Sequence, residues 1–266
     1  MSLRPELRSE VIDLLAAAGP DRFRVGMPAD GAVPLSAFKD PGTVASLVDR
    51  ACTSLRTAER TAAGFSLYYG AAGALVGPAF ALLLAVGDEL VALDPHRTML
   101  SLRADGLVDG IWPMFVVQRR RRARRIDDVA EPLRVGLAEV TAAFRPQLRI
   151  GPRSYAAAAG GVLAQYAERI GRQMGRVRPA RAMATALAAS AAPQVRVARY
   201  EVVDLGPGRR TAPVGTVCCQ WFRLAPGAFC AGCPREPEPS RSARLRDHLD
   251  RTMRPAVDDL LVEVDR

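Results

Sequence analysis

The sequence CCQWFRLAPGAFCAGC occupies residues 218–233 and holds four of the five cysteines in the 266-residue chain. Two of them are adjacent, Cys218 and Cys219, and two are separated by two residues, Cys230 and Cys233. Thiolates gathered this densely are the ligands of iron–sulfur clusters and of structural zinc ions. The segment therefore predicts a cysteine-rich loop that binds one of these two centres.

The adjacent pair bears on which centre is bound. Only Cys230 and Cys233 have the two-residue spacing that is typical of a zinc knuckle. In an extended backbone the side chains of Cys218 and Cys219 point to opposite faces, so bringing both sulfurs to one centre needs a bent backbone. A two-iron cluster accommodates such a splayed pair better than a single tetrahedral ion. This favours an iron–sulfur cluster, with a zinc site, a disulfide or thiols without a ligand as alternatives.

The segment resembles the C-terminal signature of the FhuF-type ferric-siderophore reductases. Besides the four cysteines, the resemblance includes Trp221, Phe222 and Arg223 after the adjacent pair, a Pro-Gly turn at 226–227 and an upstream Arg-Arg pair at 209–210. A looser likeness extends over residues 60–235, although the alanine-rich stretch after Tyr155 departs from the family pattern.

The resemblance implies a cofactor, an activity and partners. The cofactor is a [2Fe–2S] cluster held by Cys218, Cys219, Cys230 and Cys233, and the activity is one-electron reduction of a ferric siderophore that releases Fe(II). The implied partners are the ferric siderophore and an external electron donor such as a ferredoxin, a flavodoxin or a ferredoxin reductase. Two alternatives remain, namely a non-enzymatic electron carrier or redox sensor, and a four-cysteine zinc module that binds nucleic acid.

Other residue types exclude several classes of site. The chain has only two histidines, His96 and His248, and neither lies near the cysteines in the way that a Rieske centre requires. No glycine-rich nucleotide-binding fingerprint follows a predicted strand, so electrons are expected to come from outside the chain.

The net charge of +9 is carried almost wholly by arginine, since Lys39 is the only lysine. Six arginines fall in the seven residues 119–125, and Arg119, Arg120, Arg121 and Arg122 begin this run. A solvated surface segment is the plainest interpretation. Within the reductase hypothesis the run, together with Trp221 and Arg223, is a candidate contact for an acidic donor or an anionic siderophore. No aromatic interleaving or known DNA-binding motif accompanies it, so no nucleic-acid partner is expected.

The N-terminal residues carry mixed charge and no apolar core of a signal peptide, which predicts a cytoplasmic protein. Residues 65–87 lack charge and are long enough to span a membrane. The Gly77-Pro78 step is expected to break this stretch into two short helices buried in the core, and peripheral contact with the inner membrane face is a further hypothesis.

These patterns predict an α+β fold that is predominantly helical, with a helical core, a small β-hairpin or sheet and a C-terminal cysteine-rich loop. One globular domain would comprise a mainly helical region at 1–195, a cluster-binding segment at 196–239 and an amphipathic helix at 240–266. Helical spacing predicts helices at 4–18, from 40 onward with Cys52 on the core face, and at 128–144, 156–174 and 179–191. Residues 98–103 and 107–112 predict a hairpin capped by 114–117, residues 195–205 an extended segment, and residues 234–239 a stiff charged linker.

Overall fold

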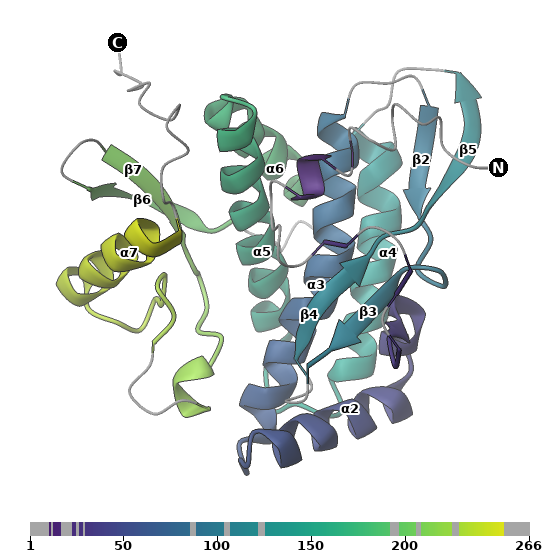
Figure 1. Cartoon of the computed structure of the whole chain (residues 1–266), viewed down its shortest axis with the longest axis horizontal. Helices are drawn as coiled ribbons and strands as arrows, with labels where there is room; N and C mark the ends of the chain where they lie inside the picture. The colour runs from purple at the N-terminus through teal and green to yellow at the C-terminus, as the bar shows by residue number, and fades with distance from the viewer. Residues whose placement is uncertain are drawn as a thin grey trace.

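The structure is a computed structural model that describes residues 11, 13–16, 23–24, 27–28, 30–85, 89–103, 107–121, 126–191, 197–205, 209–224 and 229–252. It is an α+β fold in which helices predominate and the strands form three small antiparallel sheets, as the sequence predicts (Figure 1). Its helices are α2 (Pro41–Ser54), α3 (Arg60–Leu84), α4 (Ile126–Phe144), α5 (Pro152–Gln173), α6 (Val177–Ala191) and α7 (Glu238–Thr252), with short 3₁₀ helices η1 (Leu35–Lys39) and η2 (Trp221–Arg223).

Helix α3 lies at the centre of the helical layer and contacts α2, α4 and α5. The expected break at Gly77-Pro78 is wrong, because α3 runs through both residues as one helix of 25 residues. A side chain at Gly77 would come within 2.8 Å of the rings of Phe23 and Tyr166. The glycine therefore permits close packing rather than a turn, and burial of the surrounding helix offsets the hydrogen bond that Pro78 removes.

By length and composition alone α3 could cross a membrane. In the fold, 83% of its most apolar window is buried against other parts of the protein. The helix thus serves as a core element, as the sequence pattern favoured.

Helices α2, α4, α5 and α6 agree with the predicted ranges to within a few residues, whereas most of the helix predicted at 4–18 and the end of the one predicted at 240–266 lie outside the described residues. Aromatic rings fill the space between α3, α4 and α5, with the Tyr68 and Tyr155 ring centroids 4.8 Å apart in an edge-to-face arrangement. The Tyr68 hydroxyl donates to the carbonyl of Tyr155 at 3.3 Å, and Phe144 packs edge-on against Tyr68 at 5.5 Å. The side chain of Cys52 packs against this core from α2, as predicted.

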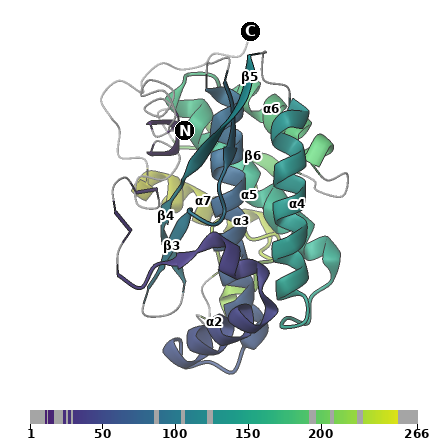
Figure 2. The same ribbon diagram turned by 90° about the vertical axis from the view of Figure 1, so that its right-hand side faces the viewer.

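The strands before α4 are β1 (Val33–Pro34), β2 (Glu89–Leu93), β3 (Met99–Leu102), β4 (Val108–Trp112) and β5 (Phe115–Arg121). The β3–β4 hairpin confirms the prediction, with Met99 opposite Trp112, and its predicted turn at 104–106 lies outside the described residues. The expectation that 114–117 would cap this hairpin is wrong. These residues begin β5, which pairs with β2 in a separate sheet at the opposite end of the molecule from α2 (Figures 1 and 2).

The C-terminal part builds a second, smaller core. Strands β6 (Arg199–Asp204) and β7 (Arg209–Val214) pair antiparallel, and α7 packs against them beside α5 and α6 (Figure 1). Leu245 and Leu249 of α7 are buried with Val203, Ala212 and Val214, and Ala231 of the cysteine segment packs on the same cluster. The predicted kink at Pro255 lies outside the described residues.

The stretch at 234–239 is not a plain linker, which corrects the sequence prediction. Helix α7 begins within it at Glu238, and the side chain of Glu236 is buried. The side chain of Arg244 satisfies the Glu236 carboxylate with hydrogen bonds of 3.0–3.3 Å, which explains how a charged residue is tolerated there.

A buried carboxylate joins the two cores. Glu168 of α5 is 3% exposed and accepts hydrogen bonds from Arg172 at 2.6 Å, from Arg181 at 2.7 Å and from the Thr211 hydroxyl at 2.8 Å. Arg172 also donates to the Thr211 carbonyl, and Arg181 lies over the Tyr200 ring at 4.1 Å. Thr211 and Tyr200 belong to β7 and β6, so this network fastens the second core to α5 and α6.

We expect Glu168→Gln to lower the free energy of unfolding by about 3 kcal/mol, because it leaves two largely buried guanidinium groups without their counter-charge. Thermal unfolding should show a fall in Tm of about 8 °C. Glu131→Gln is the control, since Glu131 forms an exposed pair with Arg134 within α4, and no measurable change in Tm is expected there. Equal effects of the two substitutions would contradict the role given to Glu168.

Candidate metal centre

The four cysteines lie between the end of β7 and the start of α7. The Gly215 amide donates to the Gly232 carbonyl at 3.1 Å, which ties the entrance of this segment to the turn between Cys230 and Cys233. The Cys233 amide closes that turn by donating to the Cys230 carbonyl at 3.0 Å. Both halves of the cysteine pattern are thereby brought together by backbone hydrogen bonds.

The backbone bends directly after the adjacent pair, as the sequence analysis required. Gln220 has a φ of 61°, in the left-handed region that residues other than glycine rarely adopt. This bend allows the Gln220 amide to donate to the Cys218 sulfur at 3.3 Å. The strained residue therefore turns the chain and supplies a backbone donor to a thiolate.

The sulfur atoms are arranged as two pairs. The Sγ atoms of Cys219 and Cys230 are 3.6 Å apart and share a hydrogen bond. Burial raises the pKa of Cys218, and the Gln220 amide partly offsets this effect. The charge of Cys233 and a hydrogen bond with its side chain raise the Cys218 pKa further, which places these two cysteines close together. Each pair combines one cysteine from the adjacent doublet with one from the later turn.

The electrostatics of this segment favour a thiolate at one position. The hydrogen bond shared with Cys230 lowers the pKa of Cys219 to about 7, and the Trp221 amide adds to this effect. The same hydrogen bond, followed by burial, raises the pKa of Cys230. One sulfur of this pair is therefore prepared to lose its proton near neutral pH, as a metal ligand must.

The donor set fits a two-iron cluster. Two thiolates on one tetrahedral metal ion, with bonds of about 2.3 Å, place their sulfurs about 3.7 Å apart, which the Cys219–Cys230 pair matches. Within the described part of the chain, no group of three or more histidine, cysteine, aspartate or glutamate side chains converges as a site for one metal ion. Two separate sulfur pairs are the arrangement in which each iron of a [2Fe–2S] cluster takes two thiolates.

The cysteine segment and its family match indicate an iron–sulfur protein. The family model of the FhuF 2Fe-2S C-terminal domain matches residues 216–235, in agreement with the resemblance seen in the sequence. The chain thus carries a FhuF-type segment with a [2Fe–2S] cluster as its cofactor, and the assignment of the four cysteines as ligands is a prediction. No curated protein matches the chain.

The other candidate residues are divided between two regions. Arg223 donates to Glu59, at the start of α3, over 2.9 Å, while Trp221 lies half-buried in η2, two residues after Cys219. Arg119, Arg120 and Arg121 belong to β5, on the opposite side of α3 from η2, and Arg122 lies outside the described residues (Figure 1). The structure therefore brings Trp221 and Arg223 to the cysteines but not the described part of the arginine run.

The sequence analysis missed Tyr69, which lies on α3 beside the cysteine segment. Burial raises the pKa of Tyr69, and the charges of Cys219, Cys230 and Cys218 raise it further, so the phenol lies near the cysteines. The ring packs edge-on against Phe65 at 5.3 Å. The residue was overlooked because it falls inside the apolar stretch 65–87, where the pattern indicates only core packing.

Gly232 was also missed, although its position within the Cys230–Cys233 turn was a possible signal. A Cβ atom there would lie 2.6 Å from the backbone carbonyl oxygen of Pro213. Only a residue without a side chain lets the turn approach β7 this closely.

Gly232→Ala is expected to push the turn away from β7 and cost about 2 kcal/mol, because a backbone atom has to move. The iron content of the purified protein should fall, and cluster absorbance should be lost faster on incubation with a chelator. Gly161→Ala in α5 is the matched control, because nothing lies within 4 Å of the added atom. Unchanged iron content in Gly232→Ala would show that the close approach to β7 does not hold the cysteines in place.

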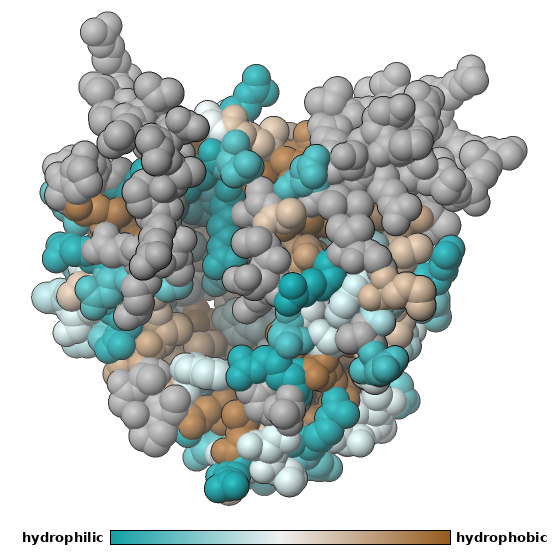
Figure 3. Space-filling view, viewed as in Figure 1, coloured by the Kyte–Doolittle hydropathy of each residue, from teal (hydrophilic) through white to brown (hydrophobic). Residues whose placement is uncertain are grey.

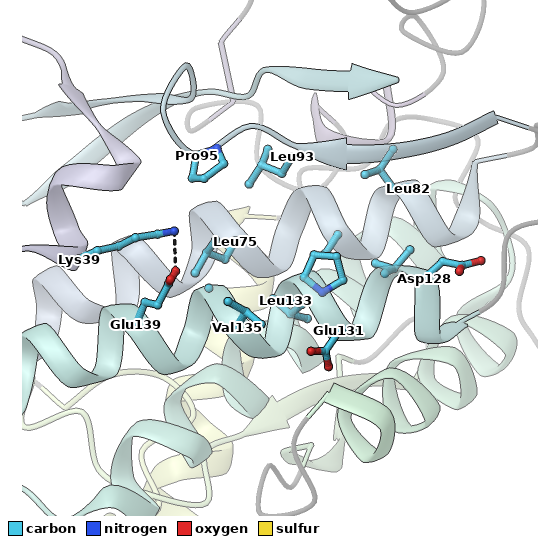
Figure 4. A pocket seen from close by; sticks show the side chains of 14 residues that line it. Lys39, Leu75, Leu82, Leu93, Pro95, Asp128, Glu131, Leu133, Val135 and Glu139 are labelled. Atoms are coloured by element: carbon cyan, nitrogen blue, oxygen red, sulfur yellow. Dashed lines mark ion pairs between the residues drawn. The ribbon is translucent and has the colours of Figure 1, made fainter. Parts of the chain in front are cut away.

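A cavity lies apart from the cysteines. An apolar cleft of about 350 Å³ lies between α3 and α4, with Leu75, Leu133 and Leu93 among its lining residues (Figure 4). Lys39 and Glu139 form an ion pair of 2.6 Å at one end of it. No residue of the described cysteine segment lines this cleft, so it takes no part in the candidate metal centre.

Proposed function

We propose that the protein is a cytoplasmic ferric-siderophore reductase that passes single electrons to the Fe(III) of the chelate and releases Fe(II) for iron assimilation. The observation that carries this proposal is the FhuF-type match over a segment in which the Cys219 and Cys230 sulfurs lie 3.6 Å apart and three of the four cysteines are partly exposed. The peripheral position at the inner membrane face stays a prediction.

The exposure of the cysteines suits electron transfer to a molecule outside the protein. Cys218, Cys219 and Cys230 are partly exposed, whereas Cys233 is buried, with 1% of its surface exposed. When bound, the [2Fe–2S] cluster supplies one electron at a time. The partly exposed side of the segment is where a chelate would approach, and the Arg223–Glu59 pair holds η2 against α3 behind it.

The products follow from the coordination chemistry of iron. A siderophore holds Fe(III) with hard oxygen donors, and its affinity falls when the metal becomes the softer, larger Fe(II). Each turnover consumes one electron from an external donor such as a ferredoxin, a flavodoxin or a ferredoxin reductase. The chelate oxygens then release Fe(II), and the free siderophore leaves the site.

The test is anaerobic visible absorption and EPR spectroscopy of the purified protein, before and after reduction with dithionite. We expect a red-brown protein that gives an S = 1/2 signal on reduction, and loss of that signal when a ferric siderophore is added. A signal that persists with the siderophore would favour an electron carrier or a redox sensor. A colourless protein that contains zinc would overturn the proposal in favour of a structural module.

A further inference from the structure

An arginine and two aromatic rings form a patch beside the cysteines. The guanidinium of Arg235 lies 5.1 Å from the ring centroid of Phe222, and the Phe222 and Phe229 centroids are 5.4 Å apart. We call these three residues the arginine–aromatic patch. Such a stack fixes the orientation of a cation that would otherwise move freely at the surface.

The patch is adjacent to the predicted cluster ligands. Phe229 directly precedes Cys230, Arg235 follows Cys233 by two residues, and Phe222 follows Cys219 by three. Arg235 is exposed, and both rings are half-buried like the neighbouring cysteines. A molecule that binds to the patch therefore contacts residues that flank Cys219, Cys230 and Cys233 in the sequence.

Arg235 differs from the other arginines around the cysteines in its pairing. Arg223 is paired with Glu59, Arg244 with Glu236 and Arg241 with Glu201. Among the described residues, no acidic group forms an ion pair with Arg235, whose guanidinium rests on Phe222. A guanidinium that is held on a ring and has no acidic partner in the described part of the chain is available to bind an anion.

We propose that the arginine–aromatic patch anchors the substrate, and that this substrate is a ferric chelate with net negative charge and aromatic donor rings. The inference rests on the proposed reductase function. Two ferric ions, two sulfides and four thiolates carry a net negative charge that grows on reduction, so an anionic chelate is repelled as it approaches. Arg235 offsets this repulsion, and the partly exposed Phe222 and Phe229 rings offer apolar surface to the rings of the chelate.

The test measures binding without turnover. Gallium(III) matches iron(III) in charge and size but is not reduced by the protein, so its chelates report affinity alone. With the cluster-loaded full-length protein, we expect a gallium tris-catecholate, which is anionic, to bind more tightly than a neutral gallium tris-hydroxamate. Arg235→Gln should raise the Kd of the anionic complex about tenfold, the scale of one charge-assisted hydrogen bond, and leave that of the neutral complex unchanged.

Arg97→Gln is the matched control, because Arg97 is an exposed arginine in the turn after β2 and makes the same change in net charge. An unchanged Kd for the anionic complex in Arg235→Gln, or an equal change in Arg97→Gln, would overturn the proposal. The proposal would also be overturned if the Arg235→Gln protein bound both chelates normally but were reduced more slowly by an acidic ferredoxin. The patch would then bind the electron donor and not the substrate. Charge-dependent gallium binding without ferric turnover would leave the anchor intact and refute only the reductase function.

Discussion

Replacing Cys230 with serine is expected to remove the [2Fe–2S] cluster and with it the reduction of ferric chelates. The hydroxyl of serine is a harder and weaker ligand for iron than a thiolate, and the sulfur of Cys230 lies 3.6 Å from that of Cys219. The rate of ferric-chelate reduction should fall more than about 100-fold. Replacing a residue that only hydrogen-bonds to a metal ligand typically costs about 10–100-fold, and the loss of a ligand itself should cost more. Iron and acid-labile sulfide per chain, the visible spectrum and the reduction rate are the measurements.

Cys52→Ser provides the control for thiol loss as such. Cys52 is a partly buried cysteine of α2 that packs on the helical core and lies outside the cysteine segment 218–233 in the sequence. Its replacement should leave iron, sulfide and the EPR spectrum unchanged. Full activity in the Cys230→Ser protein would exclude the cluster as the source of electrons, while equal cluster loss in both variants would point to general instability.

The helical part of the fold could be predicted because its signals are local. Apolar spacing in α4, α5 and α6 survives in the structure, since each helix buries one face against α3 or its neighbours. The Gly77-Pro78 step shows where local rules fail. Its role depends on Phe23 and Tyr166, which lie far away in the sequence, so no pattern around residue 77 could reveal it.

The strands were harder to predict than the helices. β7 contains Arg209, Arg210 and Pro213, and no alternation of apolar and polar residues distinguishes it as a strand. It is stabilised instead by pairing with β6 and by the Glu168 network, which are contacts between distant segments. β5 was misassigned for a related reason, because its partner β2 follows the apolar helix and gives no separate signal.

For the candidate site, the sequence predicted the chemistry but not the surroundings. Four cysteines in sixteen residues indicate an iron–sulfur cluster without knowledge of the fold. Spacing could not show that Arg223 pairs with Glu59 or that Arg235 rests on Phe222. A long arginine side chain can reach several partners, and which one it contacts depends on the folded structure.

Helix α7 gives the cysteine segment a support that lies beyond the matched residues 216–235. Arg241 of this helix is 6% exposed at its side chain and donates to both carboxylate oxygens of Glu201 in β6, at 2.7 and 3.1 Å. Its other guanidinium nitrogen donates to the Glu236 carbonyl at 2.7 Å, and the Glu236 amide donates to the Cys233 carbonyl at 3.3 Å. A continuous chain of hydrogen bonds therefore runs from β6 through α7 to a predicted cluster ligand.

Arg241→Met is expected to release the cysteine segment from this support. The substitution keeps much of the apolar stem but removes two hydrogen bonds from the partly buried Glu201, which keeps its bond from Arg199, and leaves the Glu236 carbonyl without the donor from Arg241. This should cost about 3 kcal/mol of unfolding free energy. Because the loss falls beside Cys233, the cluster should become labile before the helical core unfolds. Bleaching of cluster absorbance by a chelator should be about tenfold faster than in the unaltered protein, the lower end of the effect of losing a residue behind a metal ligand.

Arg246→Met separates this effect from a general weakening of α7. Arg246 lies on the same helix, is exposed, and donates a hydrogen bond of 2.9 Å to the Asp204 carbonyl of β6. Its replacement should leave the bleaching rate unchanged. If both variants bleach alike, α7 stabilises the small core as a whole, and if neither does, the cluster is held by the cysteine segment and β7 alone. Only faster bleaching confined to Arg241→Met, with helical circular dichroism retained, fits a helix that positions the last cysteine.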